Sequence, residues 1–214
     1  MDRIPRHQCV IYDGSPAKLL PAMAAHIKEK LKENIRCLYL NSPSMVAGLR
    51  SYLFAIGVDV VAEVAMGRLI LTSEQHQIKE GQFDSGMMLQ ELEEAVNQAL
   101  VDGFNGLWAT GDMTWEMGRD RNLKKLVEYE WHLDKLLQKY VHLSGICQYH
   151  VGSLSGEMAA NALINHSAIY VNETLTHINP HYLPSPTPVE ASADLQYTVQ
   201  NLCALQPTGN ADAQ

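Results

Sequence analysis

Short apolar runs alternate with amphipathic segments along most of the chain. Residues 8–12 and 36–40 are apolar runs of strand length that end in polar turns, and each precedes a segment with helical periodicity. In the first such segment, residues 18–33, apolar side chains recur every three or four positions, at Leu20, Met23, Ile27 and Leu31. This alternation predicts strand–helix units, which typically build a parallel sheet covered by helices.

The same pattern continues through the rest of the chain. The remaining predicted helices span residues 45–56, 87–102, 123–143 and 155–163, and the remaining predicted strands span residues 58–64, 68–72, 106–110, 146–150 and 166–171. We therefore expect an α/β three-layer sandwich with a mostly parallel central sheet. Residues 73–86 are too long and too polar for a tight connection, and loops of this kind often cover or line a site.

The composition changes near residue 184. Residues 1–183 carry the strand–helix pattern and are predicted to form one domain. Residues 184–214 begin rich in Pro, Ser and Thr, which indicates a linker, followed by a short helix over 189–205 and a disordered end.

The predicted strand 106–110 runs into a turn that carries Asp112, and Trp115 follows shortly after. Ligands of parallel sheets bind beyond the carboxyl ends of the strands, so Asp112 is a candidate ligand-binding residue. A carboxylate at this position can equally cap the helix that follows. Aromatic residues and methionines near these strand ends, such as Tyr12, Trp115 and Tyr149, are candidates for the wall of an apolar pocket, although core packing explains most residues of this kind.

Composition narrows the class of partner and the compartment. The chain has 214 residues, is 46% hydrophobic and 19% charged, and carries a net charge of −8, so it is typical of a globular protein that does not bind nucleic acid directly. It lacks the run of about 18 apolar residues that a membrane span needs, and its beginning lacks the apolar core of a signal peptide. We expect a cytoplasmic protein whose four cysteines are thiols or ligands rather than disulfides.

Cysteine and histidine recur near two predicted strands far apart in the chain. His7 and Cys9 open the first strand, and Cys147 and His150 lie on the strand 146–150. If these strands are neighbours, two thiolates and two imidazoles could bind zinc or another transition metal. Two alternatives remain open, a structural role in the core and a His/Cys pocket that binds a small ligand without metal.

The polar turn after the first strand, residues 13–19, lies where a nucleotide-binding sheet carries its phosphate loop. It lacks the second glycine of the G-x-x-x-x-G-K-[ST] pattern, and Leu19 follows Lys18 where a hydroxyl residue is required. Nucleotide is therefore not an expected cofactor. No Ser/His/Asp or G-x-S-x-G arrangement indicates a hydrolase, and we expect no enzyme activity.

The chain resembles the MEDS domain, the methanogen and methylotroph sensory domain of DcmR-like regulators. The resemblance rests on His7-x-Cys9-x-x-Tyr12, on the segment 106–115 with Asp112 and Trp115, and on Cys147-x-Tyr149-His150, and it covers residues 7–183. It implies a prokaryotic signal-transduction input domain that senses small hydrocarbon derivatives, on a RecA/KaiC-like sheet with a degraded phosphate loop. It also implies that His7, Cys9, Tyr12, Cys147 and His150 form one site, which a metal could assist.

The leading hypothesis is a non-enzymatic sensor of a small organic ligand that acts through an output partner such as a kinase or transcription regulator, or through pairing with itself. The main alternative is a RecA/KaiC-like nucleotide-binding regulator or ATPase. A plain metal-binding or thiol redox protein is a third hypothesis.

Overall fold

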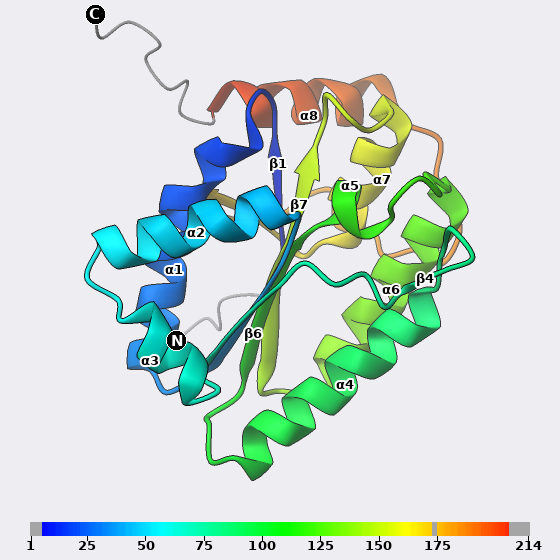
Figure 1. Ribbon diagram of the computed structural model, residues 1–214. Helices are drawn as coiled ribbons and strands as arrows, with labels where there is room; N and C mark the ends of the chain where they lie inside the picture. Colours follow the sequence, from blue (N-terminus) through cyan, green and yellow to red (C-terminus); the bar gives the residue numbers. More distant parts are fainter. Residues whose placement is uncertain (1–5, 173–174, 206–214) are drawn as a thin grey trace, which may run out of the picture.

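A single twisted sheet with helices on both faces forms the centre of the computed structural model, which describes residues 6–172 and 175–205 (Figure 1). The strand order is β3-β2-β6-β7-β1-β8-β9, and all strands are parallel except β9, which pairs antiparallel with β8. The strands are β1 (His7–Tyr12), β2 (Arg36–Leu40), β3 (Leu69–Thr72), β6 (Leu107–Asp112), β7 (Leu143–His150), β8 (Ala168–Asn172) and β9 (Leu175–Ile178). The α/β three-layer sandwich with a mostly parallel sheet is therefore confirmed.

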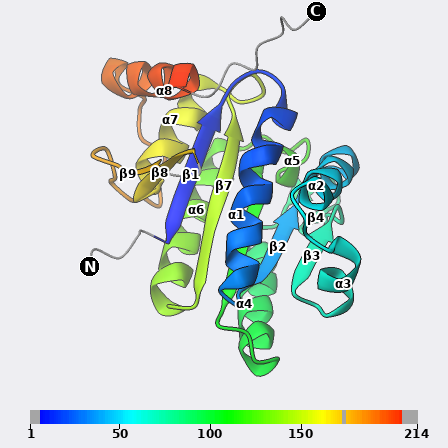
Figure 2. The same ribbon diagram turned by 90° about the vertical axis from the view of Figure 1, so that its left-hand side faces the viewer.

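The helices divide into two layers (Figure 2). One layer contains a short 3-10 helix, η1, and α1 to α3, which span Pro16–Leu19, Leu20–Lys32, Pro43–Ala55 and Val60–Ala65. The other contains α4, α6 and α7, which span Ser85–Val101, Leu123–Lys139 and Gly156–Asn165. Each layer packs its own apolar core against the sheet.

Two shorter helices complete the fold. The short helix α5 (Met113–Glu116) directly follows β6, and α8 (Ala193–Leu205) packs against α7 and β1. Val199 and Leu202 of α8 are buried in the same core as α4, α6 and α7, so the segment after residue 184 contributes to the domain core. The predicted helix over 189–205 begins four residues later than expected, and the predicted disordered end lies outside the described residues.

The structure corrects two elements. The predicted strand 58–64 is wrong, because residues Val60–Ala65 form α3, whose first turn is capped by the Asp59 carboxylate accepting from the Ala62 amide at 3.0 Å. The cap outweighs the strand preference of the four valines in residues 58–64. The predicted helix 123–143 ends at Lys139, and β7 already begins at Leu143.

The polar connection 73–86 contains a small antiparallel ladder of β4 (Ile78–Lys79) and β5 (Gln82–Phe83). This connection lies beside α5, and two of its glutamines donate hydrogen bonds to the backbone of α5. Gln75 Nε2 donates to the Trp115 carbonyl at 2.6 Å, and Gln77 Nε2 donates to the Glu116 carbonyl at 3.1 Å. Among the helices of the described residues, none has both the length and the apolar character that crossing a lipid bilayer requires.

Candidate functional site

The two strands that carry the predicted cysteines are neighbours. β1 and β7 pair in parallel, with Cys9 opposite Cys147. Alternate residues on a strand face the same side, so His7 and Cys9 share one face of the sheet with Cys147 and Tyr149. This face is covered by α6 and α7.

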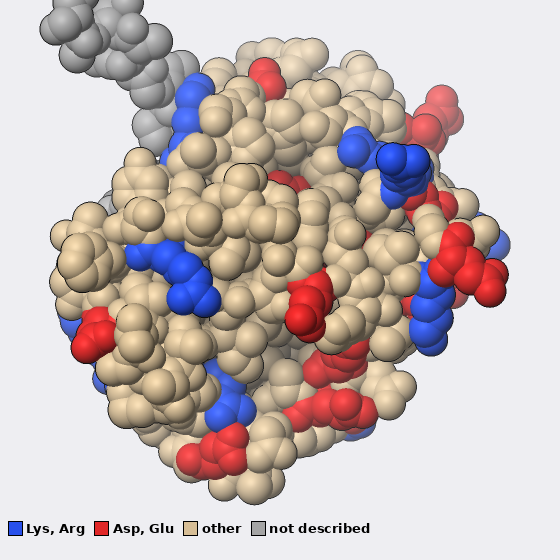
Figure 3. Space-filling view, in the orientation of Figure 1, with Lys and Arg blue, Asp and Glu red and all other residues tan. Residues whose placement is uncertain are grey.

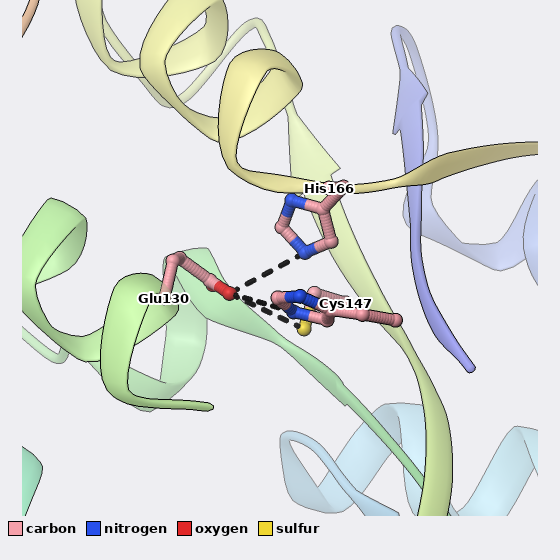
Figure 4. A group of neighbouring side chains, drawn as sticks. Glu130, Cys147 and His166 are labelled. Carbon is pink, nitrogen blue, oxygen red and sulfur yellow. Dashed lines mark hydrogen bonds and ion pairs between the residues drawn. The ribbon is translucent and has the colours of Figure 1, made fainter. Parts of the chain in front are cut away.

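A buried polar cluster lies between this face and the helices (Figure 4). Its centre is Glu130 of α6, whose side chain is fully buried. Glu130 Oε2 lies 3.2 Å from His7 Nε2, 3.3 Å from His166 Nε2 and 3.9 Å from Cys147 Sγ. The Tyr149 hydroxyl donates to Oε1 of the same carboxylate. The four residues His7, Glu130, Cys147 and His166 each offer one ligand atom, and these atoms all lie within 4.8 Å of one another.

The two histidines differ in protonation. Both ring nitrogens of His7 face carboxylates, because Nδ1 also lies 3.3 Å from Asp134 Oδ1. Burial by itself lowers the pKa of His7, but hydrogen bonds to Asp134 and Glu130 more than compensate and raise it above 6.5. Burial and the neighbouring His7 lower the pKa of His166 to about 4, so this ring is neutral near pH 7.

The hydrogen bond between His166 and the Ala162 carbonyl determines the tautomer of His166. Nδ1 lies 2.7 Å from the Ala162 carbonyl oxygen, so Nδ1 carries the proton and donates it there. The Nε2 lone pair then faces the Glu130 carboxylate, and Nε2 makes no hydrogen bond with any residue that the structure describes. A lone pair directed at a carboxylate oxygen is repulsive unless a cation or a proton lies between them.

The charges of the cluster are coupled. Burial opposes ionisation of Glu130, but hydrogen bonds with His7 and Tyr149 hold the pKa of this carboxyl below its usual value. Burial, with the nearby Glu130, raises the pKa of the Cys147 thiol well above 9, so this thiol is protonated near neutral pH when no cation is close to it.

The other predicted residues lie elsewhere, around a cleft at the carboxyl ends of the strands. Asp112 Oδ2 accepts from the Tyr12 hydroxyl at 3.0 Å, and Oδ1 accepts from the Thr114 and Trp115 amides at 2.8 and 3.2 Å. Asp112 is therefore the N-cap of α5, whichever ligand the cleft binds. The cleft has a volume of about 390 Å³ and is lined by residues that include Asp112, Trp115 and His150.

His150 does not join the buried cluster. Its Nδ1 lies 2.7 Å from Ser153 Oγ, its Nε2 lies 2.7 Å from the Gly14 carbonyl oxygen, and its ring packs on Tyr12. The structure therefore divides the predicted site in two. His7, Cys9, Cys147 and Tyr149 lie at the cluster, whereas Asp112, Trp115 and His150 line the cleft and the buried Tyr12 contacts two of them.

Sequence reasoning missed the acidic residues of α6 and the second histidine of the cluster. Glu130 and Asp134 are four residues apart on the helix face that buries Leu126, Leu133 and Leu137. A pair of carboxylates on an apolar face is a signal that the sequence contains, since buried charges need partners. His166 precedes β8, and only the pairing of β8 with β1 brings it beside His7.

Comparison with known families identifies the family of the chain. A family model described as MEDS, the methanogen/methylotroph DcmR sensory domain, matches residues 6–167 and thus includes every member of the cluster. The resemblance deduced from the sequence is confirmed. No curated protein matches the chain.

Proposed function

Since the chain belongs to the MEDS family of signalling sensor domains, we propose that it is a cytoplasmic, non-enzymatic sensor of a small organic molecule. We further propose that the cluster His7, Glu130, Cys147 and His166 binds a transition metal such as zinc, next to which the organic ligand binds. A partner protein, a kinase or a transcription regulator, receives the signal.

The observation that carries this proposal is the geometry of the four ligand atoms. Tetrahedral ligands at about 2.0–2.3 Å from a zinc ion are about 3.3–3.8 Å from one another. The distances from Glu130 Oε2 to the other three atoms are 3.2, 3.3 and 3.9 Å. Two imidazoles, a thiol and a carboxylate are donors that zinc accepts, and a cation there would remove the repulsion at His166 Nε2.

The surrounding residues orient these donors. The Ala162 carbonyl holds His166 with Nε2 inward, Asp134 holds His7, and the Tyr149 hydroxyl holds Glu130. Such partners fix ligand direction and protonation in metal sites. A zinc ion held by all four donors would have a complete tetrahedral shell, so the organic ligand would bind beside the metal rather than to it.

The same residues support a role without catalysis. Burial raises the pKa values of the thiols of Cys9 and Cys147, which makes them poor nucleophiles near neutral pH.

Elemental analysis of protein purified without added metal tests the proposal. We expect about one transition-metal ion per chain, which His166→Gln and Cys147→Ser remove. Cys37→Ser is the matched control, because Cys37 is a buried thiol in the core of the opposite helix layer, and it should keep the metal. A metal-free wild-type protein that does not take up zinc or other transition-metal ions would contradict the proposed metal site.

A RecA/KaiC-like nucleotide-binding regulator is the second candidate. The observation in its favour is the cleft of about 390 Å³, which Asp112 and Pro16 of the turn after β1 both line. Against it, residues Pro16–Leu19 form η1, which leads directly into α1 without a glycine-rich loop. Nucleotide-dependent stabilisation that Lys18→Ala abolishes would favour this candidate.

The output partner is proposed to be a protein, either another chain or a second copy of this one. On the face shown in Figure 3, Lys and Arg side chains lie in several separate places among acidic ones. With the net charge of −8, this distribution supports a partner other than nucleic acid. The oligomeric state in solution, measured with and without zinc, tests pairing of two copies.

A further inference from the structure

A small cavity adjoins the cluster in the same helix layer. Its volume is about 40 Å³, and its wall includes His7 and Cys147. By the measure in which one water needs about 10–15 Å³, the cavity has room for about three water-sized groups. Most of the remaining wall is apolar and comes from β2, β6, β7, α4, α5 and α6.

Glu116, the last residue of α5, adds one carboxyl group to this wall. Its side chain is 2% exposed, and its Oε2 makes no hydrogen bond with any described residue. A buried polar atom without a partner is rare in folded proteins and calls for an explanation.

The chain makes room for this carboxyl group. Glu116 Oε1 lies directly over Gly111 of β6, where the Cβ of any other residue would overlap it. Burial, followed by the charges of Asp112 and Glu130, raises the pKa of Glu116 well above 4.5. A protonated carboxyl group can both donate and accept a hydrogen bond.

A surface groove leads toward the cavity. The groove has a volume of about 250 Å³ and shares four wall residues with the cavity, Leu38, Leu40, Met88 and Leu92. Its outer wall includes His76 and Gln77 of the connection 73–86. Gln77 also bonds the backbone of Glu116, so the segment beside the groove is attached to the helix that carries the carboxyl group.

We infer that Glu116 is the specificity-determining residue of this cavity, whose ligand enters along the groove beside α4. The ligand has about three non-hydrogen atoms, an apolar body and one hydroxyl or amino group, which donates a hydrogen bond to Glu116 Oε2. This inference rests on the proposed function, because it names the chemical class of the sensed molecule and the residue that selects it.

The NMR signals of methionine methyl groups can report ligand binding in the cavity. Met88 and Met113 line the cavity, whereas Met23 and Met45 lie in the core of the opposite helix layer. In protein labelled with ¹³C at the methionine methyl groups, we expect ethanol to shift the Met88 and Met113 signals in a saturable manner. Acetonitrile has the same number of non-hydrogen atoms but no hydrogen-bond donor. It should bind at least about 10-fold more weakly than ethanol.

Two substitutions of Glu116 distinguish the effect of its hydrogen bond on ligand binding from the effect of its side-chain volume. Glu116→Met should weaken ethanol binding about 10-fold or more and remove the preference over acetonitrile, because no acceptor remains. Glu116→Gln, which keeps a donor and an acceptor, should bind ethanol within a few-fold of wild type. Gly111→Ala should weaken ethanol binding with the acid still present, because the new methyl group displaces the carboxyl group.

Unchanged Met23 and Met45 signals identify variants that are folded, and Gly111→Ala, which should weaken ethanol binding by displacing the carboxyl group, decides the matter if Glu116→Met does not fold. Equal affinities for ethanol and acetonitrile in the wild type, or Met88 and Met113 signals that neither compound shifts, would overturn the inference. The metal content of the same samples reports on the proposed metal site separately. Selective ethanol binding by metal-free protein would support the role of Glu116 and contradict the proposed metal site. Metal-loaded protein without selective ethanol binding would support the metal site and contradict the role of Glu116.

Discussion

Removing the Asp112 carboxylate tests whether this residue, at the end of the central strand β6, stabilises the fold or serves only to bind a ligand. Asp112 accepts three hydrogen bonds, one from the Tyr12 hydroxyl and two from the first amides of α5. Asp112→Ala removes the acceptor oxygens of all three hydrogen bonds at once. We expect a clear loss of stability even in the absence of any ligand.

The size of the loss follows from the bonds. Replacing an N-cap aspartate by alanine costs about 0.5–2 kcal/mol. Tyr12 is 1% exposed, and leaving its buried hydroxyl without a partner costs about 1–3 kcal/mol. The sum is about 1.5–5 kcal/mol, which corresponds to a fall in Tm of roughly 3–20 °C for a chain of this length.

Urea unfolding followed by circular dichroism measures this difference. Asp112→Asn is the matched control, because its amide oxygen still caps α5 and its amino group can bond the Tyr12 oxygen, so we expect a loss below about 1 kcal/mol. Tyr12→Phe combined with Asp112→Ala should cost less than the sum of the two single changes, since they remove the same bond. An Asp112→Ala protein within about 0.5 kcal/mol of wild type would refute the structural role of the carboxylate.

Three further predictions concern other parts of the chain. Cys203 should react with a thiol reagent such as DTNB well before the three buried thiols, and Cys203→Ala should remove the fast phase, because burial protects Cys9, Cys37 and Cys147. Burial, then Lys30, lowers the pKa of His26 from 6.5 to about 4, so the free energy of unfolding should fall as the pH drops through this window, and His26→Leu should flatten the profile. Tyr182→Phe should cost about 1 kcal/mol in urea unfolding, because it removes the hydrogen bond to Asp134 Oδ2; no change in stability would contradict the value of that bond.

The order of helices and strands could be predicted largely from periodicity, because most apolar runs here match one structure type. The exception, residues 58–64, shows the limit of the method. Four valines in seven residues favour a strand, yet the Asp59 cap and the packing of Val60 in the core under α1 and α2 make it a helix. Local propensity is a weak signal when a short segment has a strong cap.

The adjacency of β1 and β7 was a hypothesis that the sequence alone could not decide. Residues 7–12 and 143–150 pair only because the chain inserts β7 between β6 and β1. This order depends on which helix covers which face, and the covering helices contribute Glu130 and, after α7, His166. Half of the cluster therefore comes from segments outside the strands, where strand spacing carries no information.

The division of the predicted site has a simple geometric cause that the sequence did contain. Cys9 and Tyr12 are three residues apart on β1, as are Cys147 and His150 on β7. Side chains separated by an odd number of residues on a strand face opposite sides, so a ligand set that combines Cys9 with Tyr12, or Cys147 with His150, requires a bend in the strand. Both strands remain regular to their ends, and the cysteines therefore face α6 and α7 while Tyr12 and His150 meet at the cleft. Any molecule that contacts both groups would have to pass through the sheet, so we expect substitutions at the cluster and at the cleft to affect ligand binding independently.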